Sequence, residues 1–191
     1  MKRTLTFALL AVIIFAEAVW AQAPPPMPKP GPEQKKLAYF IGHWNTEGNL
    51  KPGPMGPGGK FTSNDQNTWL PGGFFVVLHS DGNSPMGASH EIALMGYNPD
   101  EKLYTYDGFD NMGEHDVSKG TLQGDTWTWS SESKMGGQVM KGKFTIKEVS
   151  PTEYTFKFEM STDGKTWTTG VEGKSTKVTA APGAAEKKTT K

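Results

Sequence analysis

The feature of this sequence that most constrains its fold is an alternation of apolar and polar residues, which runs with short interruptions from about residue 43 to residue 177. Residues 153–160 show it most clearly, because Tyr154, Phe156, Phe158 and Met160 alternate with polar residues. A period of two places successive side chains on opposite faces of a β-strand. The sequence therefore predicts an all-β body whose strands each bury one face.

Turn residues divide this body into short strands. Clusters of Gly, Pro, Asn and Asp separate ten predicted strands, at 43–50, 60–70, 74–80, 89–97, 102–109, 114–122, 125–133, 138–148, 153–162 and 165–177. Because most connections are short, successive strands must be antiparallel neighbours, and a two-layer sandwich would need longer crossovers. Ten strands in this order curl until the sheet closes. We predict an up-and-down antiparallel barrel of about ten strands, preceded by one short helix over residues 33–41.

The ends of the chain differ from this body. Lys2 and Arg3 precede an apolar segment over residues 5–15, and small residues follow up to Ala21 and Ala23. This pattern is typical of a secretory signal peptide, and the apolar segment is shorter than the roughly 20 residues of a membrane span. We predict a signal peptide over 1–21, a proline-rich tether over 22–32, the barrel domain over 33–177 and a disordered tail over 178–191. Cleavage after Ala23, or an uncleaved anchor, are the alternatives.

Charge and cysteine content exclude several classes of function. The 20 basic and 20 acidic side chains balance, so the chain lacks the positive field of nucleic-acid-binding proteins. Arg3 is the only arginine, which disfavours phosphate ligands, and the absence of cysteine excludes disulfides, thiolate nucleophiles and Cys-ligated metals. No serine-hydrolase elbow or paired catalytic carboxylates are evident. The sequence favours a binding protein over an enzyme, predicts no cofactor, and leaves the oligomeric state open.

A set of short motifs spans the predicted barrel. The junction Gly42-His43-Trp44 follows the helix, and further Gly-rich or aromatic motifs lie at 47–48, 69–73, 95–100, 110–113 and 120–125. The junction resembles that of the calycin superfamily, which includes the lipocalins. The whole set resembles an uncharacterised family of exported bacterial proteins, domain of unknown function 1579 (DUF1579).

This resemblance covers about residues 37–177 and implies a calycin-like, lipocalin-like barrel in the periplasm or outside the cell. It implies no established activity. Calycins often stack an arginine on the tryptophan of the junction, and the barrel domain has no arginine. Lys174 or Lys177 would cover Trp44 with its aliphatic stem instead.

Methionines gather at one end of the predicted barrel. Connections that leave odd-numbered strands share one end, and four of them place a methionine beside a glycine: Met55, Met86, Met112 and Met135. Lipocalins open at this end, and flexible thioethers adapt to irregular apolar ligands. We predict that these residues surround the mouth, with the Gly- and Pro-rich residues 51–59 as a lid. Methionines that only cap the core, or a copper(I) site, are the alternatives.

Three histidines fall near the same end. His79 is in phase with Phe75 and Val77, His90 is in phase with Ile92 and Leu94, and His115 follows the next loop. If those apolar faces point inward, His79 and His90 would orient a ligand or hold a metal; otherwise they are surface histidines. Asp65, Asn67 and Asp107 are further candidates for polar groups inside the barrel.

The leading hypothesis is a binding protein that holds a small, largely apolar ligand inside the barrel. The predicted lining is aromatic: Trp127, Trp129, Phe144, Phe156, Phe158 and Trp167. One alternative is an enzyme or a haem- or metal-binding barrel that uses His79, His90 or His115, although no histidine follows His115 to serve as the haem ligand of nitrobindin-like barrels. The other alternative is a structural or interaction barrel with a filled core.

Overall fold

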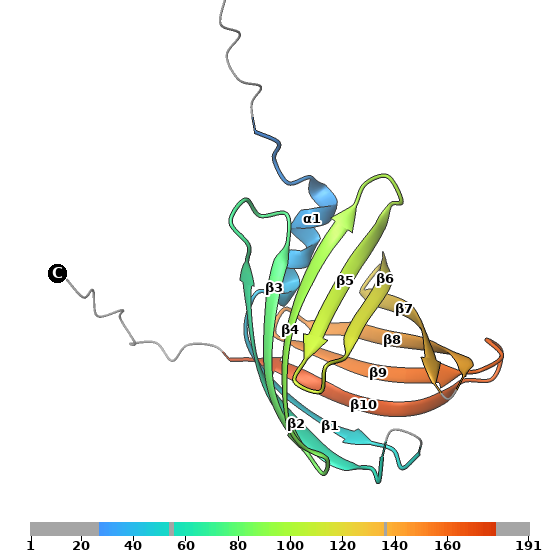
Figure 1. The fold of residues 1–191 in the computed structure, drawn as a ribbon. Helices are drawn as coiled ribbons and strands as arrows, with labels where there is room; N and C mark the ends of the chain where they lie inside the picture. Colours follow the sequence, from blue (N-terminus) through green and yellow to red (C-terminus); the bar gives the residue numbers. More distant parts are fainter. Residues whose placement is uncertain (1–26, 54–55, 136, 179–191) are drawn as a thin grey trace, which may run out of the picture.

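The computed structural model describes residues 27–53, 56–135 and 137–178. In this part of the chain, ten antiparallel strands close into a barrel in which neighbours in sequence pair and β1 pairs with β10 (Figure 1). The strands are β1 (Gly42–Leu50), β2 (Gly59–Trp69), β3 (Val76–Ser84), β4 (Gly87–Asn98), β5 (Leu103–Asp110), β6 (His115–Gln123), β7 (Thr126–Met135), β8 (Gln138–Ser150), β9 (Glu153–Ser161) and β10 (Thr168–Lys177). The predicted all-β barrel is confirmed. The predicted signal peptide and nearly all of the tail lie outside the described residues.

Most predicted boundaries shift by one or two residues, and three elements change more. The predicted helix is a short α-helix, α1 (Pro32–Lys36), that continues into a 3-10 turn, η1 (Leu37–Phe40). Strand β3 extends to Ser84, because its polar residues 81–84 pair with residues 87–90 of β4, and the predicted loop shrinks to a two-residue turn. Strand β10 begins at Thr168 instead of residue 165.

The two ends of the barrel differ in what covers them. The connections from odd to even strands meet at one end, which we call the loop end, and α1 and η1 cover the other, which we call the helix end (Figure 1). Leu37 and Phe40 of η1 are almost fully buried in the helix end. The helix therefore acts as a plug at the end opposite the predicted mouth.

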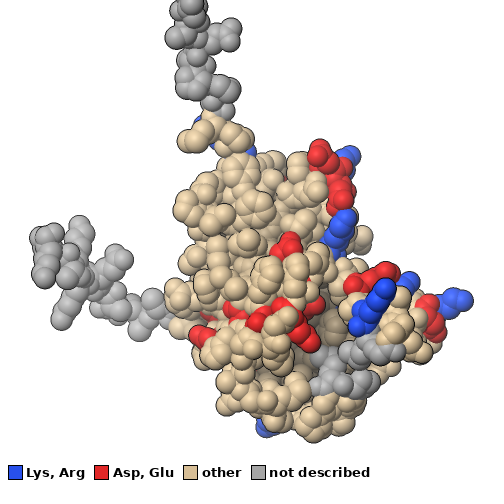
Figure 2. All heavy atoms as spheres, viewed as in Figure 1, with Lys and Arg blue, Asp and Glu red and all other residues tan. Residues whose placement is uncertain are grey.

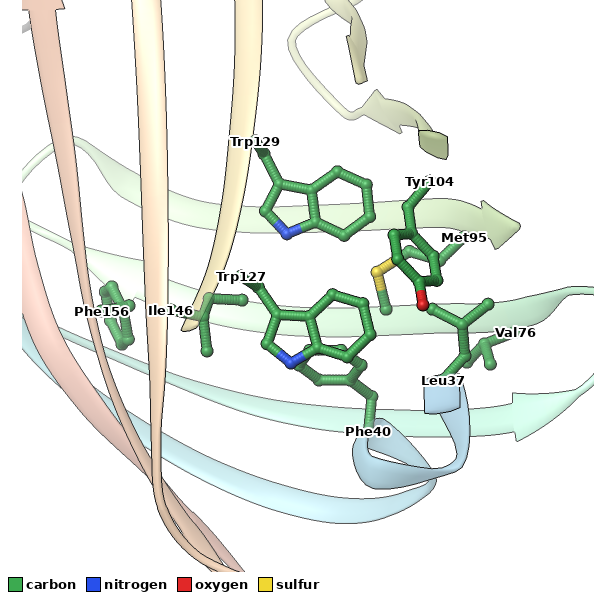
Figure 3. Packing of buried hydrophobic residues seen from close by; sticks show 9 residues of the cluster. All are labelled: Leu37, Phe40, Val76, Met95, Tyr104, Trp127, Trp129, Ile146 and Phe156. Carbon is green, nitrogen blue, oxygen red and sulfur yellow. The ribbon is translucent and has the colours of Figure 1, made fainter. Parts of the chain in front are cut away.

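Large side chains fill the helix end. The Phe40 ring lies edge-on to Trp127, with centroids 5.1 Å apart, and Tyr104 lies 4.8 Å from Trp127 on the other side (Figure 3). The cluster consists of Leu37, Phe40, Val76, Met95, Tyr104, Trp127, Trp129, Ile146 and Phe156. Apolar burial of this kind is the main stabilising term in folding.

Trp44 lies at the base of the helix end. Its indole Nε1 donates a hydrogen bond of 2.7 Å to the carbonyl oxygen of Phe40, which ties β1 to the plug. Lys177 Nζ lies 4.6 Å from the centroid of the Trp44 ring and donates to the Tyr39 carbonyl oxygen at 3.1 Å. Burial lowers the pKa of Lys177. Of the two lysines predicted to cover Trp44, Lys177 does so, whereas Lys174 pairs with Glu47 on the outer face.

Candidate ligand-binding interior

Small residues occupy much of the inner face at the loop end. Their positions follow from the register of the strands, in which partner residues share a face. They are Ser63, Ser80, Gly82, Ser84, Ser89, Gly108, Ser118, Ser131 and Gly142. Side chains of this size cannot fill the barrel as the aromatic residues of the helix end do.

One wall of the loop end is apolar. Strands β8, β9 and β2 contribute the inner-face rings of Phe144, Phe156, Phe158 and Phe61. Phe144 and Phe156 stack with centroids 5.5 Å apart, and Phe61 lies 6.3 Å from Phe156. Phe156 is almost fully buried, but the other three rings are only half-buried. We call these four residues the apolar wall.

A pair of glycines makes room for the apolar wall. Gly48 of β1 lies directly opposite Gly173 of β10. A Cβ atom on Gly48 would lie 2.6 Å from the Phe61 ring, and one on Gly173 would lie 2.6 Å from the Phe156 ring. These distances are far below van der Waals contact, so both rings occupy space that any larger residue would take.

The opposite wall is polar. Register places Asp65 of β2, Ser80 of β3, Glu91 of β4 and Asp110 of β5 in one cross-strand row. We call these four residues the acidic row. On the outer surface, Figure 2 shows acidic side chains gathered over the region of β4 and β5. The Asp65 carboxylate accepts hydrogen bonds from Thr46, Ser63 and Ser80, at 2.8, 2.9 and 2.5 Å.

Glu91 is the carboxylate of this row whose pKa burial shifts. Burial raises its pKa, nearby acidic residues add to the rise, and the hydrogen bond that Tyr106 donates to it opposes the rise. Burial and the Glu91 carboxylate raise the pKa of Tyr106 as well. A hollow of about 80 Å³ adjoins Glu91 and Gly108. A Cβ atom on Gly108 would lie 2.8 Å from Glu91 Oε1, so this glycine also makes room for the carboxylate.

The acidic row has no ion-pair partner within the described residues: each ion pair found there involves other carboxylates. Arg3 is the single arginine of the chain, so the basic side chains of the barrel domain are lysines and histidines. The lysine at an inner-face position, Lys177, lies over Trp44 at the helix end. The interior therefore carries carboxylates with which no cationic side chain of the described residues forms an ion pair.

A second, larger hollow lies on the outside of the barrel. It is an open groove of about 830 Å³ over strands β1, β2 and β7–β10, flanked by outward-facing lysine, glutamate and threonine residues. Lys174 and Glu47 on its rim form an exposed ion pair of 3.1 Å. Exposed ion pairs of this kind contribute little to binding or stability, so the groove offers no desolvated polar group to orient a ligand.

The predicted aromatic lining divides into three groups. Phe144, Phe156 and Phe158 lie in the apolar wall, as described above. Trp127 and Trp129 also face inward, but they belong to the packed core, and the Trp127 indole donates to Glu148 at 2.7 Å. Trp167 lies outside this lining, beneath Lys143 of the outer face at 4.2 Å. It precedes β10, which begins later than predicted and has an irregular register near its start.

Of the two alternatives left open for the histidines, the structure shows the surface placement. The inner face of β3 carries Val76 and Ser80, so His79 points outward; His90 also points outward and pairs with Asp81 at 2.7 Å. His115 pairs with Asp107 at 3.3 Å on the outer face, so Asp107 is not an inner residue either. Asp65 and Asn67 do face inward. The histidines alternate in phase with Phe75, Ile92 and Leu94, and this was misleading because these three apolar residues are themselves 40–46% exposed.

Only two of the four methionines predicted to surround the mouth have side chains that the structure describes. Met86 and Met112 are exposed at the loop end, at 52% and 67%. Met55 lies outside the described residues, and Met135 ends β7, although its side chain is not described. The described residues contain no group of three or more metal-ligating side chains. The same residues include no helix long and apolar enough to cross a membrane.

Sequence reasoning missed Glu91 and Tyr106, the central pair of the polar wall. Both faces of β4 carry apolar residues, Ala93 and Met95 inside and Ile92 and Leu94 outside. Alternation alone could not decide which face of such a strand points inward. The available signal was the row Asp65, Ser80 and Glu91, which appears once β2, β3 and β4 are paired.

Comparisons with known proteins agree with the fold. The profile of a family described as "Protein of unknown function (DUF1579)" matches residues 29–177. Rv2717c from M. tuberculosis has a similar structure, with 11% identity, a TM-score of 0.54 and coverage of 78% of this chain and 99% of that one. The S-type phycobiliprotein lyase CPES from Guillardia theta has 9% identity, a TM-score of 0.56 and coverage of 78% and 94%. No curated protein matches the sequence.

Proposed function

The chain belongs to the DUF1579 family of proteins of unknown function, and we propose that it is an exported bacterial barrel protein that binds a small, largely apolar molecule in the loop end of its interior. One observation carries this proposal. Phe144 and Phe158 face inward but are only partly buried, beside inner positions taken by glycine and serine. A barrel with a purely structural core would be expected to bury such rings fully.

The hollow beside Glu91 is small, at about 80 Å³, and is also lined by Phe109 and Glu114 at the loop end, so a ligand larger than a few waters must displace side chains. Met140 and Met160 are at inner-face positions near the loop end and have flexible, unbranched side chains. Their rearrangement would widen the space beside the apolar wall. Changes of side-chain rotamer on binding are common, and a barrel of eight or more strands has room for one small ligand.

A matched pair of variants on β7 tests where binding occurs. Ser131 faces inward opposite Gly142, whereas its neighbour Ser130 faces outward opposite Lys143. We expect Ser131→Phe to weaken binding of the neutral dye N-phenyl-1-naphthylamine by at least about tenfold, and Ser130→Phe to leave it within about twofold. Dye fluorescence measures the affinity, and thermal unfolding checks that both variants fold.

Two results would overturn this proposal. If the dye does not bind the wild type, the barrel has a filled core and acts as a structural or interaction module. If both serine variants bind it equally, the dye occupies another surface, such as the outer groove. The proposed export is tested separately: the mature protein should begin at Gln22 or Pro24 by N-terminal sequencing, and retention of Met1 would contradict it.

A further inference from the structure

The two walls of the loop end differ in chemistry and lie on opposite sides of the barrel. Three rings of the apolar wall, Phe144, Phe156 and Phe158, come from β8 and β9, and Phe61 comes from the loop-end part of β2; the acidic row comes from β2 to β5. In the closed order of strands, these groups are separated by β6 and β7 on one side and by β10 and β1 on the other. A molecule between them would contact aromatic rings at one end and carboxylates at the other.

We propose that this interior site selects molecules whose apolar body ends in a protonated amine, with the ammonium group bound by Glu91 and Asp65. The inference rests on the proposed function above, because it names the class of ligand for the same site. An ammonium group has three donors and no acceptor, so it suits a wall whose carboxylates have no cationic partner. Hydrogen bonds between charged donors and carboxylates are also stronger than neutral ones.

The missing counter-charge supports this choice of ligand. Glu91 is largely enclosed, and no lysine of the described chain pairs with it or with Asp65. A carboxylate removed from water without a cation is unfavourable, and a cation brought by the ligand would offset that cost. An anionic ligand would instead be repelled by the same residues.

A buried hydrogen-bond acceptor without a partner also supports a ligand that carries donors. Asn67 follows Asp65 by two residues on the same inner face of β2 and is 4% exposed. Its amide nitrogen donates to the Phe40 carbonyl oxygen at 3.0 Å, but its Oδ1 accepts no hydrogen bond within the described residues. Buried acceptors are rarely left unpaired in folded proteins. Asn67 is the next inner position of β2 toward the helix end, so an ammonium group bound at Asp65 would bring a donor toward this atom.

A metal ion is a weaker explanation for the same residues. A calcium or magnesium site needs about six oxygen ligands, and the described residues bring no three acidic or histidine side chains together in ligating geometry. The Asp65 carboxylate is already held by Thr46, Ser63 and Ser80. One organic ammonium needs fewer partners than a metal ion, and its apolar substituent would lie on the apolar wall.

Three ligands of equal chain length test the inference at pH 7: octylamine, octanol and octanoate, each measured by displacement of the neutral dye. We expect octylamine to bind at least about tenfold more tightly than octanol, and octanoate to bind most weakly. Glu91→Gln keeps the size of the side chain and removes its charge, so the ratio of amine to alcohol affinity should fall to about one. Because both ligands are measured on the same protein, partial unfolding cancels from this ratio.

Asp65→Asn provides a second inner variant, for which the ratio should also fall. Asp107→Asn on the outer face of β5 is the matched control and should keep the wild-type ratio. Equal affinities for amine and alcohol in the wild type, or an unchanged ratio in both inner variants, would overturn the inference while leaving binding by the barrel intact. Absence of dye binding would instead overturn the proposed function itself.

Discussion

The helix end and the loop end of the barrel share the same ten strands but differ in what their inner faces carry. At the helix end, Trp127 and Trp44 are at most 1% exposed and pack against the plug formed by η1. At the loop end, serine and glycine alternate with carboxylates and half-buried rings. One architecture thus provides a packed core at one end and an under-filled, charged interior at the other.

This difference would let one domain separate its stability from the proposed binding of a ligand. Fully burying a large apolar side chain contributes roughly 1.5–3 kcal/mol. Eight residues of the buried cluster lie at the helix end, and Phe156 of the apolar wall is the ninth, so the cluster can offset the cost of small and charged residues elsewhere. Substitutions at the helix end should therefore affect unfolding most, and substitutions at the loop end should affect ligand binding most.

The largest expected effect is that of Trp127→Ala. The substitution removes a fully buried ring, its contacts with Phe40 and Tyr104, and the hydrogen bond to Glu148. We expect it to lower the free energy of unfolding by about 3–5 kcal/mol. Phe158→Ala at the loop end removes a half-buried ring and should cost less than about 2 kcal/mol. Urea denaturation measures both, and equal losses would mean that the two ends are packed alike.

Gly173→Ala is expected to have the next largest effect. A Cβ atom there would lie 2.4 Å from the Glu47 carbonyl oxygen and 2.8 Å from Gly48 Cα, and backbone atoms cannot easily move aside. Overpacking of this kind typically costs about 1–3 kcal/mol. Gly53→Ala is the control, because no atom lies within 4 Å of its Cβ position. Urea midpoints that match for the two variants would show that the Gly48–Gly173 contact is not tight.

A smaller effect should appear when pH is varied, because burial raises the pKa of Glu91 above its ordinary value of 4.5. A group with a raised pKa in the folded state stabilises the fold below its unfolded pKa, and that contribution is lost as pH rises through the folded pKa. Glu91→Gln cannot ionise. Wild-type protein should therefore lose stability relative to Glu91→Gln between pH 4 and pH 8.

Thermal unfolding of both proteins across this pH range measures the effect. Asp65, Asp110, Asp116 and Tyr106 face Glu91 in both proteins, so their own titration largely cancels from the difference. A difference in melting temperature that stays constant with pH would mean that Glu91 is solvated like an exposed glutamate.

Much of the fold was predictable because its signals are local. Alternation in residues 153–160 and the turn residues between strands placed all ten strands in the right order, and short turns allowed only antiparallel pairing. The stacking of Lys177 on Trp44 was also predictable, since both residues lie at strand ends that a closed barrel brings together.

The candidate site was less predictable because it depends on which face of each strand points inward. Strand β9 has one apolar and one polar face, so Phe156 and Phe158 were assigned correctly. Strands β3 and β4 carry apolar residues on both faces, and the exposed Ile92 and Leu94 made the wrong face of β4 appear to be the inner one. That error put His90 inside and left Glu91 outside. Only the pairing of β4 with β3 and β5 resolves this ambiguity.

The smallest expected effect concerns the base of the helix end. Lys177→Met keeps an aliphatic stem over Trp44 but removes the ammonium group and its hydrogen bond to Tyr39. We expect it to lower the free energy of unfolding by about 1 kcal/mol, the usual size of a partly buried cation–π contact. Lys174→Met, which removes an exposed ion pair with Glu47, should cost less than about 0.5 kcal/mol. If urea denaturation gave the reverse order, the seal over Trp44 would depend on the aliphatic stem alone, and the helix end would be held by apolar packing without help from charge.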